Sequence, residues 1–234
     1  MNNPRDLTSI TQTAQYRIRI DSLLEQGLIF LQSLNGRRLD MCSTREEICV
    51  GSSLHRGYYH PSPVYDILVG NTKRGKLLKR PTSAAKYTHK YIYGTENKLE
   101  KVETVVQSSV AFIEYIQRTG NRQLGFTIDC SGNLSTVCEE IFDNNRLVAF
   151  SVLNCSFNGI EYSCYNYHFE NYYYDDDGIC ECDFINYSPR SSMLIDEHYI
   201  FDRSDGCLTA YTNTASQAKY AIKTKRKASQ PPFF

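Results

Sequence analysis

The stretch Tyr172–Cys180, Tyr-Tyr-Tyr-Asp-Asp-Asp-Gly-Ile-Cys, has the pattern of two strand ends joined by a tight turn. Aromatic residues precede an aspartate that can open the turn with its side chain, and a glycine supplies the positive φ angle that closes it. An apolar residue then begins the returning strand. The same outline recurs at 91–99, 126–134 and 199–208. The chain is therefore predicted to contain several similar β-hairpins.

Most of the chain after residue 87 has the two-residue alternation of half-buried strands, interrupted by turn-forming residues. Connections this short allow only antiparallel neighbours. We predict an α+β protein that is mainly β, with a long antiparallel meander of about ten or eleven strands over residues 64–214. The predicted strands are 87–93, 99–106, 110–116, 123–129, 134–141, 147–154, 160–169, 172–175, 180–187, 193–201 and 208–212.

The N-terminal part has helical periodicity instead. Apolar residues recur at steps of three and four between Thr13 and Leu34. Ser43-Thr-Arg-Glu46 has the form of a capping box, which predicts a second short helix. Residues 1–50 are therefore expected to form a short helical element that packs on the sheet.

The expected organisation is a single domain of residues 1–214 followed by a basic, flexible tail of residues 215–234. The N-terminus lacks the apolar stretch of a secretory signal, and no apolar run is long enough to span a membrane. The nine cysteines are odd in number and scattered. We therefore expect a cytoplasmic protein with reduced thiols and no membrane partner.

The formal charge is zero, but the charges are segregated along the chain. Residues 1–124 carry 18 basic and 11 acidic side chains, and residues 125–210 carry 15 acidic and three basic ones. Residues 211–234 carry five basic side chains and no acidic one. The acidic block is also rich in tyrosine and phenylalanine. Carboxylates beside aromatic rings suit contact with a cationic protein surface and do not suit phosphate.

The four hairpins resemble the tyrosine–aspartate repeats of RHS-type bacterial proteins, whose hairpins stack into extended sheets around toxin domains. The shared outline is an aromatic residue, an aspartate, a short turn closed by glycine, and an apolar residue. The copy at 91–99 departs from it, with Gly94 in place of the aspartate, and the copy at 199–208 has one more residue in its turn. The resemblance implies an association with bacterial polymorphic-toxin systems.

These observations predict a cytoplasmic binding protein that covers a cationic partner with an acidic, tyrosine-rich face. In its most concrete form this is an immunity protein that neutralises a bacterial toxin, such as a nuclease with a positive substrate cleft. Enzymatic activity is not assigned, and neither a cofactor nor a metal is expected. The predicted contact residues are Glu170, Tyr172, Tyr173, Tyr174, Asp175, Asp176, Asp177, Glu181 and Asp183.

An alternative site is the loop that contains His55, His60 and Asp66, which is the densest group of reactive side chains. A pocket there would suit a carbohydrate-binding protein or a hydrolase. The competing interpretation is an ordered loop whose rings pack under the sheet. The chain has no Gly-x-Ser-x-Gly motif that would favour a serine hydrolase.

Two motifs imitate ligand sites. Gly70–Lys76 imitates a phosphate-binding loop, but Leu77 stands where a hydroxyl is required. Cys180 and Cys182 could bind zinc together with His168 or His198, but the second closely spaced ligand pair is missing.

Two further binding modes are disfavoured. Asp175–Asp177 lacks the distal glutamate of a calcium-binding loop. Nucleic-acid binding through Lys73–Arg80 and the basic tail is disfavoured by the neighbouring acidic block.

Overall fold

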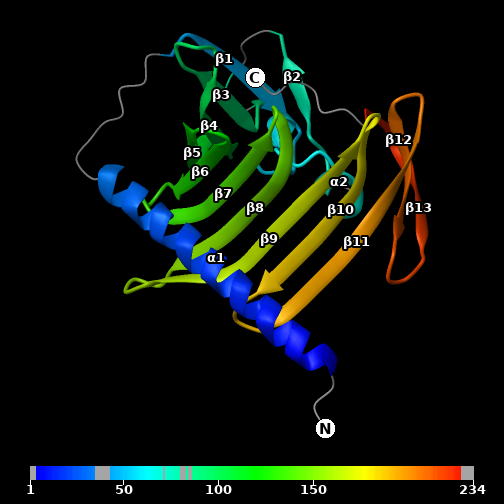
Figure 1. Cartoon of the computed structure of the whole chain (residues 1–234). Coiled ribbons are helices and arrows are strands. Elements are labelled where there is room, and N and C mark those ends of the chain that lie inside the picture. Colours follow the sequence, from blue (N-terminus) through cyan, green and yellow to red (C-terminus); the bar gives the residue numbers. More distant parts are fainter. Residues whose placement is uncertain (1–3, 35–42, 71, 80–82, 84–85, 228–234) are drawn as a thin grey trace.

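The computed structural model describes residues 4–34, 43–70, 72–79, 83 and 86–227 (Figure 1). They contain one antiparallel sheet of 13 strands in the order β13-β12-β11-β10-β9-β8-β7-β6-β5-β4-β3-β1-β2. From β3 to β13 each strand pairs with its neighbours in sequence, which confirms the predicted meander. The strand count is slightly higher than expected, because residues 45–50, 76–78 and 219–227 form additional strands at the edges of the sheet. The predicted strands 160–169 and 172–175 are parts of one strand, Tyr162–Asp175.

The elements have the following bounds. The helices are α1 Pro4–Leu34, the 3-10 helix η1 Gly57–Tyr59 and α2 Tyr65–Leu68. The strands are β1 Arg45–Val50, β2 Lys76–Leu78, β3 His89–Tyr93, β4 Leu99–Val106, β5 Ser109–Thr119, β6 Arg122–Asp129, β7 Leu134–Asp143, β8 Arg146–Phe157, β9 Tyr162–Asp175, β10 Gly178–Ser188, β11 Met193–Ser204, β12 Cys207–Asn213 and β13 Lys219–Lys227.

The predicted hairpin chemistry is present in the turns. The Asp129 carboxylate accepts hydrogen bonds from the backbone N–H groups of Ser131 and Asn133, at 2.8 and 2.9 Å. Gly132, with φ +84°, closes that turn. The Asp175 carboxylate accepts in the same way from the N–H of Asp177. Aspartate therefore opens these turns and glycine adopts the left-handed conformation, as the sequence outline predicts.

Two predictions at the edges of the sheet are wrong. The capping-box pattern Ser43–Glu46 does not begin a helix, because residues 45–50 form β1 and pair with both β3 and β2. Strand pairing buries Cys49 completely, which outweighs a local helix signal. The tail prediction fails for residues 219–227, which form β13 along β12. Residues 228–234 lie outside the described part of the chain.

Helix α1 crosses one face of the sheet diagonally (Figure 1). Ile20, Leu23 and Phe30 point into the sheet and are buried against it, and Phe30 stacks on Phe126 with ring centroids 4.3 Å apart. The helix lies close against β7 at Gly27, where a Cβ atom would lie 2.6–2.7 Å from two side chains of that strand. We call this face the helix-side face.

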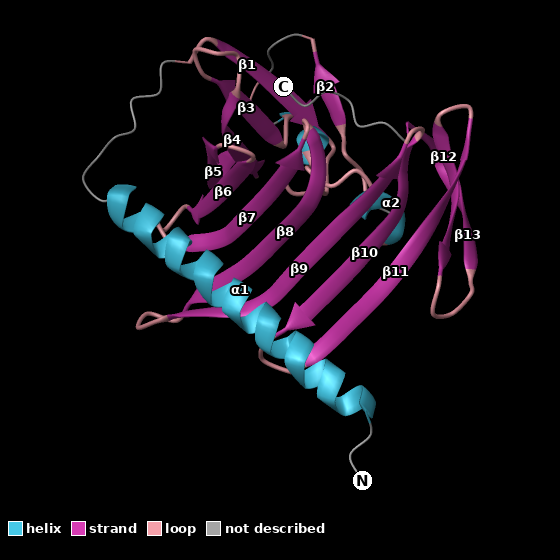
Figure 2. Ribbon diagram, viewed as in Figure 1, coloured by secondary structure: helices cyan, strands magenta, loops and turns pink. Residues whose placement is uncertain are grey.

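The opposite, loop-side face is covered by residues 51–69, which include α2 (Figure 2). Val64 is fully buried there and packs with Phe150, Tyr172 and Phe184 of three adjacent strands. The middle strands of the sheet thus lie between a long helix on one face and an irregular loop on the other. None of the helices in the described residues is both long and apolar enough to cross a membrane.

Candidate functional site

The loop-side face contains a buried ionic cluster around Arg56. Only 3 % of Arg56 is exposed, and its Nε donates to both carboxylate oxygens of Glu114 at 2.9 and 2.8 Å. Its Nη1 donates to Glu140, which also accepts a hydrogen bond from Gln123. Burial alone would raise the pKa of Glu114, but the Arg56 guanidinium and His55 hold that pKa well below its usual range.

Gly125 makes room for this cluster. It lies on β6, directly opposite Cys138 of β7. A Cβ atom at this position would overlap the Glu114 carboxylate and lie 2.5 Å from Nη2 of Arg56. A side chain at Gly125 would therefore displace the guanidinium from Glu114.

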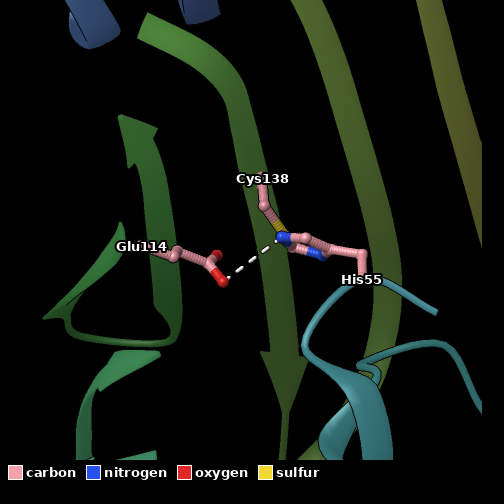
Figure 3. Close-up of side chains that lie close together, drawn as sticks. All are labelled: His55, Glu114 and Cys138. Carbon is pink, nitrogen blue, oxygen red and sulfur yellow. Dashed lines mark ion pairs between the residues drawn. The ribbon is translucent and has the colours of Figure 1, made fainter. Parts of the chain in front are cut away.

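His55, Glu114 and Cys138 converge beside Arg56. Figure 3 shows their side chains pointing toward one another from the 51–60 loop, β5 and β7. One potential ligand atom from each residue lies within 4.8 Å of the other two. His55 Nε2 is 3.2 Å from Glu114 Oε2. This is the group within the described ranges that has the donors and spacing to hold a metal ion.

The sequence did not indicate this group. Glu114 and Glu140 are 58 and 84 residues from Arg56, so no local motif links them. The available signal was that each glutamate occupies a core-facing position of a predicted strand. A carboxylate at such a position must be paired inside the protein.

A second buried group centres on Glu170, which is 0 % exposed. Its carboxylate accepts hydrogen bonds from the hydroxyls of Ser62 and Tyr172, both at 2.5 Å, and contacts His168 at 2.6 Å. Glu170 therefore ties the loop to β9. The prediction that Glu170 and Tyr172 contact a partner is wrong, because both lie on the loop-side face, where Ser62 and Val64 of the loop cover them.

The side chains predicted to line the alternative pocket pack against other parts of the protein. His60 and Asp66 are both buried. Arg74 donates to the His60 carbonyl at 2.9 Å and to the Asp66 carboxylate at 3.2 Å. Burial, with a smaller effect from Arg74, lowers the pKa of His60 well below its usual value.

The loop rings pack as side chains of a core. His60 stacks on Tyr65 with centroids 5.1 Å apart and lies edge-on to Phe150. His55 and His60 are near each other, at 6.3 Å between ring centroids. The structure thus brings the three predicted residues into one region, with the rings packed under the sheet. Arg74, from the segment that imitates a phosphate loop, is bound to this loop.

The other predicted contact residues lie near the β9–β10 turn. Tyr173 is 42 % exposed on the helix-side face, whereas Tyr174 is half-buried and donates to the Leu147 carbonyl at 2.8 Å. Asp175 forms a two-pronged ion pair with Arg203, and Asp176 and Asp177 are exposed. The Arg203 hydrogen bond lowers the pKa of Asp175 to about 2.

Tyr173, Glu181 and Ile200 are lateral neighbours on three adjacent strands. The Tyr173 hydroxyl donates to Asp183 at 2.6 Å. His198 lies between two carboxylates, with Nδ1 2.8 Å from Asp183 and Nε2 3.2 Å from Glu181. We define the acidic patch as Tyr173, Asp176, Asp177, Glu181, Asp183, His198 and Ile200.

The fold redistributes the segregated charge. Three carboxylates of the acidic block pair with cations from the flanking basic segments, in the pairs Arg56–Glu140, Arg122–Glu139 and Lys219–Asp202. Glu140 and Glu170 are buried. The negatively charged surface is therefore smaller than the 15 acidic side chains of residues 125–210 suggest.

The Cys180–Cys182 motif does not form a ligand pair. A register shift between Ile179 and Glu181 interrupts the strand alternation beside it. Cys180 donates to the Tyr173 carbonyl and Cys182, fully buried, donates to the Asp183 carbonyl. Each thiol is thus engaged separately.

No protein-family model matches this chain, and no curated protein is similar enough to count as a relative. A function must therefore be inferred from the geometry of the chain itself.

Proposed function

We propose that this protein binds a cationic protein surface through the acidic patch on β9–β11. The observation that carries the proposal is that two large side chains, Tyr173 and Ile200, are exposed next to carboxylates. Tyr173 is 42 % and Ile200 44 % exposed, and Glu181 lies directly between them in the sheet. Exposed aromatic and aliphatic area bordered by charge is typical of a protein-binding surface.

The position of the patch supports access by a partner. Helix α1 crosses β9 and β10 away from the turn that joins them, so no helix or strand of the described residues covers the strand ends near that turn on the helix-side face (Figure 1). Asp176 and Asp177 extend the patch into this turn and are exposed. They would attract a basic partner at a distance, while Tyr173 supplies a rigid contact.

In its concrete form the protein is an immunity protein that occludes the basic substrate cleft of a toxin. This part of the proposal rests on the hairpin resemblance to toxin-associated repeats and on charge complementarity. A cleft that binds nucleic acid is lined by Lys and Arg, which match the carboxylates of the patch. Occlusion would neutralise the toxin without any chemical step.

The test is association kinetics with purified products of the adjacent reading frames, at low and high salt. The variant Asp176→Lys/Asp177→Lys/Glu181→Lys is expected to associate at least about tenfold more slowly and to lose the salt dependence. Asp175 is left intact because it pairs with Arg203.

The control reverses two exposed acidic residues outside the patch, Glu25 on α1 and Glu161 in the β8–β9 connection. It should associate like the wild type. Tyr173→Ala should act differently, by raising the dissociation rate. Equal association rates for the triple variant and the wild type would overturn the proposal.

A further inference from the structure

We propose that His55, Glu114 and Cys138 bind a divalent transition-metal ion, with zinc the best fit. This site lies on the loop-side face, across the sheet from the acidic patch, and is independent of the proposed partner binding. It uses one imidazole nitrogen, one carboxylate oxygen and one thiolate sulfur. These are the three donor types that zinc takes in proteins.

The spacing of the donors fits a single ion. Zinc bonds of about 2.0–2.3 Å in a tetrahedral arrangement place ligand atoms roughly 3.3–3.8 Å apart. The three donor atoms already lie within 4.8 Å of one another. His55 Nε2 and Glu114 Oε2, at 3.2 Å, need almost no movement. Small rotations of the side chains would complete the coordination.

The ring of His55 supplies a separate indication. Both of its nitrogens are buried atoms without a hydrogen-bond partner. Nε2 faces the Glu114 carboxylate at 3.2 Å, and this is an ion pair only when His55 is protonated. Buried polar atoms are seldom left unsatisfied. A metal ion bound at Nε2 would give the nitrogen nearest Glu114 a partner.

The surroundings resemble the outer shell of a metal site. Arg56 donates hydrogen bonds to Glu114 from both Nε and Nη2, and a further one to Glu140 from Nη1. Such partners fix the orientation of a ligating carboxylate. Gly125, opposite Cys138, keeps the space beside Glu114 free of a side chain. Glu114 and Cys138 are therefore pre-positioned on β5 and β7, and His55 is added by the loop.

The site would have an open position. Three protein ligands leave the fourth tetrahedral corner for water or another small ligand. Glu114 and Cys138 are buried, but 25 % of the His55 side chain is exposed. An ion would therefore enter the site from solvent beside His55, on the side where the 51–60 loop lies.

The experiment is titration of reduced, chelator-treated protein with Co²⁺, followed by absorption spectroscopy. Binding should produce a thiolate-to-cobalt charge-transfer band that saturates at one ion per chain. Zn²⁺ should displace the band and raise the midpoint of thermal unfolding. Cys138→Ser should abolish the band.

Cys182→Ser is the matched control, because Cys182 is equally buried on the same face. It should retain the band. His55→Gln, at a partly exposed position, covers the case in which Cys138→Ser fails to fold. Losing a direct ligand should weaken Co²⁺ binding by more than the roughly 10–100-fold that changes in the outer shell cause.

A band that persists in folded Cys138→Ser would assign the metal to other thiols and overturn the proposal. If the wild-type protein shows no band, His55 and Glu114 form an ion pair only. This result would also overturn the proposal. Neither result bears on association through the acidic patch, which is measured separately.

Discussion

The guanidinium of Arg56 and the carboxylate of Glu114 form a buried ion pair, with Nε 2.8 and 2.9 Å from the two carboxylate oxygens. Arg56 comes from the loop and Glu114 from β5. The pair therefore fastens the irregular segment to the sheet. Arg56 adopts a left-handed backbone conformation, with φ 53°, at the start of η1.

Arg56→Met is expected to lower the free energy of unfolding by about 3–5 kcal/mol, because it leaves two buried carboxylates without their cation. Urea denaturation measures this. The control is Arg122→Met, which breaks the more exposed pair with Glu139 and should cost less than about 1 kcal/mol. Similar losses for the two variants would show that burial does not set the strength of the Arg56 pair.

Gly27→Ala is expected to destabilise the protein although alanine is the better helix former. The gain in helix propensity is about 1 kcal/mol, and the cost of overpacking against β7 is about 1–3 kcal/mol. The new Cβ would lie 2.6 Å from Leu134 and 2.7 Å from Val137. We expect Val137→Ala to be less harmful in the Gly27→Ala background than alone, as a double-mutant cycle would measure. A more stable Gly27→Ala protein would contradict this contact.

Stability should fall as the pH decreases from 6.5 to 4. Burial, aided by nearby His55, lowers the pKa of His89 to about 4 from its usual 6.5. In this window the unfolded chain binds a proton at His89 that the folded protein does not bind. The free energy of unfolding should therefore drop by about 2 kcal/mol per such histidine between pH 7 and pH 5.

His60 should add to this loss, because its pKa is lowered in the same direction. His89→Gln should reduce the pH dependence of denaturant unfolding. An unchanged slope between pH 7 and 5 in that variant would exclude His89 as a contributor.

Cys155 and Cys164 are expected to form a disulfide under mild oxidation with diamide. They are directly opposite in the β8–β9 pair, and their thiols hydrogen-bond to each other. That hydrogen bond lowers the pKa of Cys164, which favours its thiolate as the attacking group. Peptide mapping after alkylation should detect the cross-link first at this pair. Cys164→Ser should prevent it, and a first cross-link elsewhere would refute the expectation.

The meander was predictable because its signals are local. Two-residue alternation, aspartate at the start of a turn and glycine at a positive φ act within a few residues, as in the turn from Asp129 to Gly132. The helical periodicity before Leu34 is equally local. Tyr173 facing outward between Tyr172 and Tyr174 follows from the same alternation.

The edge strands were not predictable in this way. β1 and β13 exist because neighbouring strands offer unpaired backbone groups, and this outweighs a capping-box pattern in one case and a basic, polar composition in the other. Side-chain alternation is weak where only a few residues are buried. Pairing partners decide the structure of such segments.

The candidate sites also combine features that local sequence predicts with features that depend on distant contacts. The acidic, tyrosine-rich composition and the exposed carboxylates of the β9–β10 turn follow from local sequence alone. The burial of Glu170, the pairing of Arg56 with acidic residues of two distant strands, and the meeting of His55, Glu114 and Cys138 arise only when the chain folds. Burial and charge pairing depend on contacts between residues far apart in the chain, and local patterns of residues do not encode these contacts.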